Sequence, residues 1–448
     1  MSNQFPSLIN DQDNLKALVT DILAEATRQG ASSAEAGIAS SSGLSVSVRL
    51  GEVETIEHIR DRGIGVTIYL GKRKGSASTT DFNRKAIKET IRAACTIARY
   101  TSEDNYAGLA DPARMATDMP DLDLYHPWEL EPKAAIAIAV ESENVAREFD
   151  SRITNSEGAT LSWHEGTHVY GNSHGFLGVH SGTRHSTDCT VIAGSGSEMQ
   201  RDGWYTSARD PIDLEDARTV GAKAAKRAVA RLDARRITTQ TVPIVFQSEI
   251  ATSLFGHFLS AISGAMLYRK SSFLLDHSGK RVFPEFVRIH EQPHLPKAPG
   301  STTFDNEGVA TKPRDVVTSG ILQGYMLSSY SARKLGMETT GNAGGTHNLT
   351  IEPNTGNSSE ILNEMGTGLL VTELMGSGVN IVTGDYSRGA SGFWIERGQI
   401  EFPVQEITIA GNLRDIFLGI RRIGNDVEKR GNIRTGSVLI EQMTVAGS

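Results

Sequence analysis

The chain has 448 residues, with 53 acidic against 45 basic side chains and a formal net charge of −8. This length exceeds one ordinary hydrophobic core and predicts two or three domains. The acidic balance gives no general attraction to nucleic acid, and no apolar run is long enough to cross a bilayer. Only two cysteines are present, which excludes a disulfide framework and an all-cysteine zinc site. The first 15 residues lack a basic region followed by an apolar core, so we expect a cytoplasmic protein without a secretory signal.

The first 235 residues predict helices and antiparallel strands in a repeated order. Segments with apolar residues at helical spacing flank stretches in which apolar and polar residues alternate, as they do in half-buried strands. Glycines near residues 41–43 and 62–63 are interpreted as turns between short strands. We therefore expect one N-terminal α+β domain over residues 1–235, built from two helix–strands–helix units at about residues 12–101 and 131–232.

The second part of the chain, residues 236–448, predicts a β-rich domain. It begins with a buried strand at 242–246 and an amphipathic helix at 249–264, followed by a long irregular region that contains five prolines. Short glycine-rich strands fill the remainder. We expect this domain to be mainly antiparallel β structure, arranged as a barrel or a sandwich.

The helix at residues 249–264 carries a feature that bears on function. One face is apolar, and the opposite face has a stripe of small residues that includes Thr252, Gly256 and Gly264. Such a stripe predicts close approach of another backbone, because glycine inside a helix otherwise costs about 1 kcal/mol relative to alanine. His257 stands beside this stripe. A single helical histidine is more typical of a hydrogen-bonded structural group than of a metal ligand.

His164, Glu165 and His168 form a literal H-E-x-x-H pattern, which is the signature of zinc proteases. That signature requires a helix, because a helix places both histidines on one face within reach of a single ion. Here Gly166 separates the histidines, and the β-favouring residues Thr167, Val169 and Tyr170 predict a strand. In a strand, residues four apart lie about 13 Å from each other. The pattern is therefore interpreted as a chance match on a hairpin.

Three other segments are weaker candidates for a binding or catalytic site. Arg388, in the turn-rich segment 384–389, is placed to hold a carboxylate or phosphate, although Asp385 also suits a purely structural turn. Residues 341–347 are flexible enough for a loop near a site. Residues 328–334 contain serine and lysine, but no base or oxyanion hole is predicted beside them.

Ten stretches of this sequence match one protein family in order, from about residue 12 to the C-terminus. They include RGIGVTIYLGKRKGSASTTD (62–81), FGHFLSAISG (255–264), STTFDNEGV (301–309), EMGTGLLVTELMG (364–376) and VTGDYSRGASGFWIERGQI (382–400). On these residues the chain resembles the TldD/PmbA family, and within it the PmbA (TldE) branch.

The resemblance implies a site that has lost its chemistry in this chain. TldD-type subunits carry an H-E-x-x-x-H motif on the helix equivalent to 249–264 and take a further zinc ligand from a cysteine near the C-terminus. Carried over, His257 matches the second histidine, while Thr252 and Ser253 stand where the first histidine and the glutamate would be. Residues 432–448 contain no cysteine. The resemblance thus implies no catalytic or metal-binding residue here, with His257 as a remnant and zinc in the TldD-type partner.

Three functional hypotheses follow. The first is a non-catalytic PmbA/TldE-type subunit that pairs with a TldD-type subunit in a zinc-dependent metalloprotease complex for unfolded or extended peptides. On this hypothesis the chain is a component of a peptidase, and its status as an enzyme on its own is left open. The second is a self-sufficient metallopeptidase that uses His164, Glu165 and His168. The third is a regulatory binding protein, since the family also carries a DNA gyrase modulator label; the acidic charge argues against DNA contact. We expect no nucleic-acid or membrane partner, and a homodimer in the partner's absence stays open.

Overall fold

A computed structural model describes residues 12–447 as a mixed α+β fold, which confirms the predicted class. Residues 1–11, on which most of the expectation about a secretory signal rests, lie outside the described residues. In the described part, no helix is both long and apolar enough to span a membrane. The N-terminal elements are α1 (Gln12–Arg28), β1 (Ser33–Arg49), β2 (Glu52–Leu70), β3 (Arg73–Thr79), α2 (Arg84–Tyr100), α3 (Pro132–Glu148), β4 (Ile153–Asn172), β5 (Leu177–Ala193), β6 (Gln200–Ala208) and α4 (Ala217–Ala230).

The strands between α1 and α2 and those between α3 and α4 form one sheet. Its six strands follow the order β3-β2-β1-β4-β5-β6, and every neighbouring pair is antiparallel. Strands β1 and β4 join the units along nearly their whole length, from Glu35 opposite Asn172 to Val48 opposite Ala159. Neither unit therefore has a complete sheet of its own.

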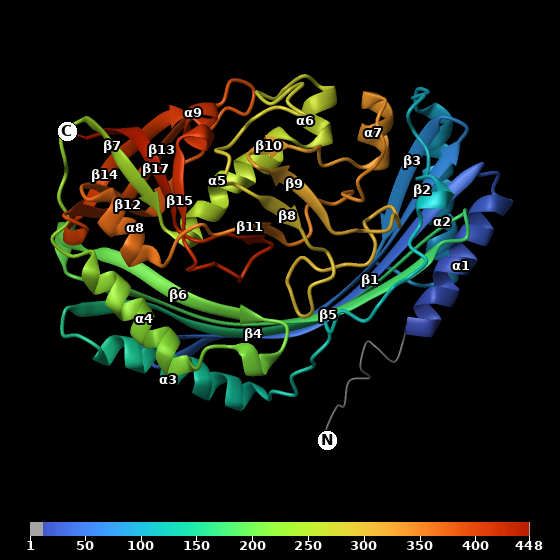
Figure 1. Cartoon of the computed structure of the whole chain (residues 1–448). Helices are drawn as coiled ribbons and strands as arrows, with labels where there is room; N and C mark the ends of the chain where they lie inside the picture. The colour runs from blue at the N-terminus through green and yellow to red at the C-terminus, as the bar shows by residue number, and fades with distance from the viewer. Residues whose placement is uncertain (1–11, 448) are drawn as a thin grey trace.

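The sheet is strongly curved, and its two faces have different roles (Figure 1). Helices α1 and α2 cover the convex face at one end, over a buried cluster that includes Ile38 and Val169. Helices α3 and α4 cover it at the other end, over Leu44, Val46 and Leu161. Because side chains alternate between faces along a strand, the neighbours of these apolar residues point into the concave side.

Two predicted turns in this region are wrong. Strands β1 and β2 run without a break through residues 41–43 and 62–63. The glycines stand inside the strands on the concave face, where Gly37 lies opposite Gly65 and Gly63 lies opposite Ala39. Glycine within a strand marks close approach of another group as often as it marks a turn.

The C-terminal region contains the predicted barrel. Its elements are β7 (Gln240–Phe246), α5 (Ser248–Ala261), α6 (Gly264–Tyr268), β8 (Ile289–Glu291), β9 (Arg314–Thr318), β10 (Ile321–Leu322), α7 (Ser329–Leu335), β11 (Leu349–Ile351), α8 (Ser358–Met365), β12 (Gly368–Met375), β13 (Asp385–Glu396), β14 (Gln399–Asn412), α9 (Leu413–Leu418), β15 (Ile420–Ile423), β16 (Ile433–Arg434) and β17 (Val438–Ala446). Strands β7, β12, β13, β14 and β17 close into a ring, in which only β7 and β12 pair in parallel. A smaller five-stranded sheet has the order β10-β9-β8-β11-β16.

Helix α5 packs between these sheets. Phe258 makes edge-to-face contacts with Phe283, at 5.0 Å between ring centroids, and with Phe417, at 6.0 Å. Leu254 and Phe255 are also fully buried in the same core. Burial of side chains of this size contributes about 1.5–3 kcal/mol each, which fixes the helix firmly in the domain.

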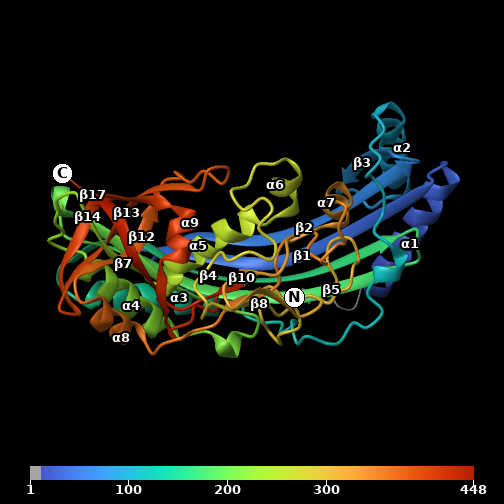
Figure 2. The same cartoon turned by 45° about the horizontal axis from the view of Figure 1, so that its top comes forward.

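The C-terminal region lies in the concavity of the N-terminal sheet and touches it at both ends (Figures 1 and 2). At the α1–α2 end, the Tyr330 hydroxyl donates to Asp104 at 2.6 Å, and Arg333 donates to three backbone carbonyls in residues 106–109. At the α4 end, Arg227 of α4 bonds Glu249 of α5 at 3.1 Å. The middle of the concave face lies between these two supports.

Candidate functional site

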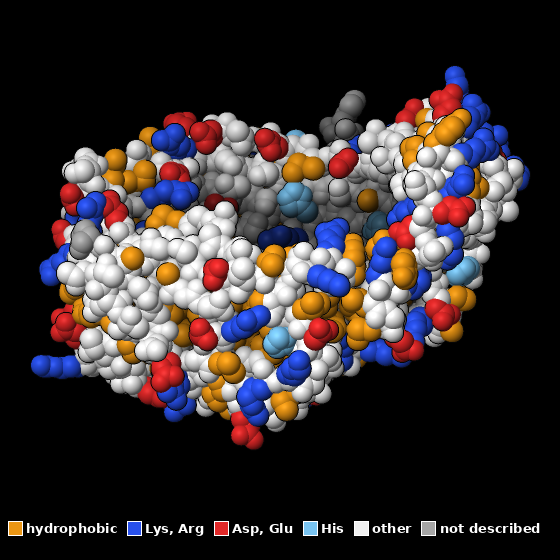
Figure 3. All heavy atoms as spheres, turned by 90° about the horizontal axis from the view of Figure 1, so that it is seen from above, with side chains coloured by type: hydrophobic (Ala, Val, Ile, Leu, Met, Phe, Trp, Pro, Cys, Tyr) orange, Lys and Arg blue, Asp and Glu red, His pale blue; other side chains and the backbone are white. Residues whose placement is uncertain are grey.

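The middle of the concave face is hollow. Seen from above, the molecule has a deep recess between the sheet and the C-terminal region (Figure 3). A cavity of about 770 Å³ in the sheet side of this recess is lined by residues of β1, β2, β3 and β4. Its floor consists largely of small residues, among them Gly37, Ala39, Gly63, Gly65 and Ser78. The floor is therefore almost bare backbone, which leaves room for another chain or a ligand to lie close to the sheet.

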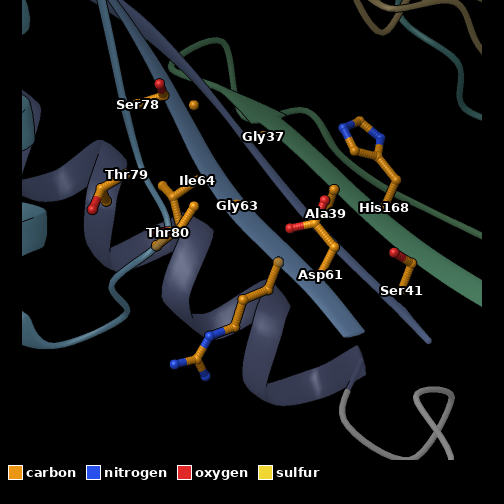
Figure 4. Close-up of a pocket in the computed structure, with 12 residues that line it drawn as sticks. Gly37, Ala39, Ser41, Asp61, Gly63, Ile64, Ser78, Thr79, Thr80 and His168 are labelled. Atoms are coloured by element: carbon orange, nitrogen blue, oxygen red, sulfur yellow. The ribbon is translucent and has the colours of Figure 1, made fainter. Parts of the chain in front are cut away.

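His168 contributes an aromatic ring to this floor (Figure 4). Its ring comes from β4 and lies beside Gly37 of β1, so close that a Cβ at Gly37 would stand 3.3 Å from the imidazole Nε2. His180 of β5 is opposite His168 in the sheet register, and its ring lies 5.8 Å from that of Phe304. Burial lowers the pKa of both histidines. Neutral imidazoles therefore line this wall at neutral pH.

The H-E-x-x-H pattern lies on strand β4, as the prediction of a strand required. His164 and His168 point to the concave face, whereas Glu165 points to the convex face. There its carboxylate accepts hydrogen bonds from Ser42 Oγ at 2.9 Å and from the Tyr125 hydroxyl at 2.6 Å. A metal ion beside either histidine is on the other side of the sheet from this carboxylate. The geometry therefore argues against a metallopeptidase that uses these three residues.

Helix α5 holds the three positions that the family resemblance singles out. The Thr252 hydroxyl donates to the Glu249 carbonyl, and the Ser253 hydroxyl donates to the Ile250 carbonyl, both at 2.7 Å. Both hydroxyls are thus used within the helix. His257 packs edge-to-face on Tyr386 at 6.0 Å, and its buried Nε2 has no hydrogen-bond partner among the described residues.

Burial and the nearby Arg388 charge lower the pKa of His257. The Nε2 atom thus makes no hydrogen bond among the described residues, and the ring packs against Tyr386. Arg388 also has a structural role, because its Nε donates to the Met375 carbonyl at 3.4 Å, and Asp385 bonds Thr383 and Asn412. The structural interpretation of segment 384–389 fits these contacts.

The small-residue stripe of α5 differs in part from its prediction. A Cβ at Gly264, the first residue of α6, would collide with the Ser331 side chain, so this position needs glycine for close packing. A Cβ at Gly256 would meet only Ile433, at 4.0 Å. No described backbone approaches Gly256. Gly256 is therefore not required for close packing of another backbone, and a side chain, that of Ile433, lies beside it.

Glu249, at the start of α5, belongs to an ionic cluster between the two parts of the molecule. Arg227 donates to Glu249 at 3.1 Å and to Asp202 of β6 at 3.0 Å, and Arg430 lies 3.7 Å from Glu249. The Arg430 guanidinium also stacks over Trp204 of β6 at 4.2 Å. Through these ion pairs, Glu249 links α5 to the N-terminal part of the molecule.

The other predicted segments are structural. In loop 341–347, the buried Glu291 carboxylate accepts from Asn342, Thr346 and the His347 backbone at 2.7–2.9 Å, and pairs with Arg314. In segment 328–334, Ser328 caps α7. Ser329 in the same segment has an Oγ without a hydrogen-bond partner among the described residues, and this side chain is buried.

Sequence reasoning missed the concave floor itself. The signal was present in the alternation of β1, where Gly37, Ala39 and Ser41 share one face while Ile38 and Leu44 share the other. The prediction instead ends strands near Gly43 and Gly63, because glycine also suits a turn.

A catalytic zinc site does not fit the residues of α5. Such a site needs three protein ligands and an open position. His257 supplies one imidazole, while the hydroxyls of Thr252 and Ser253 are bound within the helix. Among residues 12–447, no group of three or more His, Cys, Asp or Glu side chains is arranged to hold a metal ion.

Comparison with known proteins matches nearly the whole chain to one family. Domain 1, the central domain and the C-terminal domain of PmbA/TldA metallopeptidases match residues 34–98, 125–232 and 239–447. The chain is 51% identical, over 92% of its length and 92% of the relative's, to the metalloprotease PmbA of Escherichia coli O157:H7.

Solved structures show the same fold. A protein from Bacteroides thetaiotaomicron that carries a DNA gyrase modulator name superposes with a TM-score of 0.93 at 29% identity, covering 97% of this chain and 99% of that one. TldE from Thermococcus kodakarensis superposes with a TM-score of 0.84 at 21% identity, covering 96% and 100%.

Proposed function

Because the chain belongs to the PmbA/TldD metallopeptidase family, we propose that it is the non-catalytic, TldE-type subunit of a zinc-dependent peptidase. In this proposal a TldD-type partner supplies the zinc and the catalytic residues. The present chain supplies structure around the active chamber and admits unfolded or extended peptides, and the complex works in the cytoplasm.

One observation carries the proposal. Helix α5 keeps the packing of an active-site helix, with Leu254, Phe255 and Phe258 fully buried, but its potential ligand positions hold Thr252, Ser253 and a packed His257. A single neutral imidazole does not hold a catalytic zinc. The carboxylate nearest in sequence, Glu249, is neutralised by Arg227 and Arg430. It is therefore not available as a general base.

The concave recess supports the second part of the proposal. An extended polypeptide needs a long surface on which side chains do not block the backbone, and the floor of small residues provides one. The chain's role toward substrate is then steric: it leaves room for an unfolded strand and excludes a folded domain.

The test is to purify this chain and the TldD-type subunit of the same organism separately, and to assay each and their mixture on an unfolded peptide. We expect negligible zinc and no hydrolysis from this chain alone, and chelator-sensitive hydrolysis from the mixture. His257→Leu in this chain should leave the activity of the mixture unchanged. Chelator-sensitive hydrolysis by this chain alone, lost in His257→Leu, would overturn the proposal.

A further inference from the structure

A second cavity, of about 520 Å³, lies where α7 meets the α1–α2 end of the sheet. It is lined by residues of β1, β2 and β3, of the loop at 101–110 and of α7. Its lining shares no residue with that of the cavity over the bare floor. A volume of this size lies within the range of pockets that hold small ligands, about 300–1,000 Å³.

The charged side chains that line this cavity are balanced in number. They are three acids and three bases: Glu35, Asp104, Glu307, Lys72, Lys74 and Arg333. Asp104 accepts a hydrogen bond from the Tyr330 hydroxyl, and Arg333 donates to three backbone carbonyls. The two remaining acids and two lysines make no ion pair with a described residue. A cavity with this balance suits a ligand that carries both charges better than it suits a simple ion.

The two remaining acids, Glu35 and Glu307, are partly buried. Glu35 accepts hydrogen bonds from the hydroxyls of Tyr69 at 3.1 Å and Tyr170 at 2.8 Å, and Glu307 accepts from the Ser329 backbone N–H at 2.8 Å. Burial, followed by the charge of Glu35, raises the pKa of both tyrosines, so these phenols stay neutral at physiological pH. Neutral donors hold a carboxylate in place but leave its negative charge, which a cationic donor pairs with more strongly.

The two lysines, Lys72 and Lys74, are exposed at the mouth of the cavity. Lys72 Nζ donates to the Ala107 carbonyl at 3.2 Å, and Lys74 Nζ lies 5.9 Å from the centroid of the Tyr69 ring. Because the hydroxyl of the same ring bonds Glu35, the Tyr69 side chain lies between the basic and the acidic ends. The two ends are thus separated by about the length of a tyrosine side chain. This is comparable to the ~7 Å that two extended residues span.

We propose that this cavity binds a dipeptide or similarly short peptide, with its α-ammonium at Glu35 and Glu307 and its carboxylate at Lys72 and Lys74. Naming a peptide as the ligand rests on the proposed function, because a peptidase releases short peptides. The arrangement of charges itself requires a zwitterion of this length. A simple amine leaves both lysines without a partner, and a simple carboxylate leaves both acids without one.

The experiment is calorimetric titration of the full chain, without any partner subunit, with alanyl-leucine at neutral pH. Leucine is chosen because Ala107 and Leu109, which pack with Tyr69, give this cavity an apolar wall. We expect saturable binding of one peptide with a Kd below about 1 mM. N-acetyl-alanyl-leucine lacks the ammonium, and alanyl-leucinamide lacks the carboxylate. Each should bind at least tenfold more weakly than alanyl-leucine.

Two variants assign the two ends of the peptide. Glu35→Gln keeps the size of the side chain and an acceptor for the tyrosines, and it should weaken alanyl-leucine at least tenfold without further weakening the acetylated peptide. Lys72→Met/Lys74→Met should weaken alanyl-leucine to a similar degree without further weakening the amide. The matched control Lys85→Met/Glu89→Gln neutralises an exposed pair on α2 and should leave binding unchanged. Circular dichroism checks that all variants are folded.

Three results overturn the proposal. They are a lack of saturable binding up to about 10 mM peptide, equal affinity for alanyl-leucine and either blocked peptide, and unchanged affinity in either variant. Binding is measured on the isolated chain and needs neither zinc nor hydrolysis. Hydrolysis by the mixture without dipeptide binding therefore rejects this proposal alone, whereas dipeptide binding with an inactive mixture rejects the proposed function alone.

Discussion

Strand β4 and helix α5 differ in how they place residues of the kinds that a zinc peptidase uses. Strand β4 has the residues, His164, Glu165 and His168, but a strand sends the glutamate to the opposite face from the histidines. Helix α5, which the family resemblance singles out, holds Thr252, Ser253 and a single histidine, His257. A catalytic motif therefore depends on the directions in which its side chains point. These directions differ between a strand and a helix even when the sequence is the same.

The carboxylates show the same contrast. Glu165 is held by two hydroxyls on the convex face, and Glu249 is held by two arginines at the junction of the two parts. Both are structural acceptors in this chain, and they differ in how much the fold depends on them.

The largest effect is expected at the helix. Arg227→Met removes the guanidinium that Asp202 and Glu249 share and leaves Arg231 beside Asp202 and Arg430 beside Glu249; both carboxylates are largely buried, at 13% and 21% side-chain exposure. Loss of one partner from a buried ionic cluster costs about 3 kcal/mol. Urea unfolding should show this loss. The control Arg218→Met breaks an exposed pair with Glu141 and should cost less than about 0.5 kcal/mol.

A smaller effect is expected at the strand. Glu165→Gln keeps the shape but weakens the bonds from Ser42 and Tyr125, for a loss of about 1 kcal/mol in unfolding free energy. Peptide hydrolysis by the mixture with the TldD-type subunit should not change, whereas replacing a catalytic general base lowers rates by about 10²-fold or more. Glu401→Gln, on an exposed stretch of β14, is the matched control. A hundredfold loss of activity in Glu165→Gln alone would restore the strand motif as a site.

The smallest expected effect is a change in how the unfolding free energy depends on pH, and it compares His168 on β4 with His257 on α5. Burial lowers the pKa of His168 on the strand and of His257 on the helix. The unfolded chain then binds protons below about pH 6.5 that the folded chain does not, so the unfolding free energy falls as pH decreases through this range. Burial raises the pKa of Asp188 and Asp305 to about 6, which opposes the loss below that pH.

His168→Gln removes one of these histidines and should make the fall of the urea midpoint between pH 7 and 6 shallower. His257→Leu should do the same to a similar degree, because both rings are partly buried. Equal slopes in all three proteins contradict the assignment of neutral imidazoles to the folded state.

Much of the architecture was predictable from local patterns. The repeated helix–strands–helix order and the glycine-rich barrel follow from the spacing of the apolar residues. The β-favouring residues Thr167, Val169 and Tyr170 were enough to predict that the H-E-x-x-H residues lie on a strand. The turns at residues 41–43 and 62–63 were wrong because a glycine in a bare sheet floor and a glycine in a turn look alike in sequence.

The long-range features were not predictable in the same way. Nothing near Glu249 in sequence reveals Arg430 as its neighbour, and residues 52–63 of β2 have no outer partner strand in the described part of the chain because β3 ends at Thr79. Such features depend on where elements end relative to one another, and single-sequence patterns locate element ends poorly.

The pairing of β1 with β4 has a consequence for how the chain acquires its structure. Its partners, such as Glu35 with Asn172, are on the order of a hundred residues apart, and contacts of this kind slow folding because a long loop must close first. During synthesis, the first unit is made while the inner edge of β1 still lacks β4. The nascent chain thus carries an apolar, unsatisfied strand until the second unit emerges, and this interval is when misassembly and chaperone capture are most favoured.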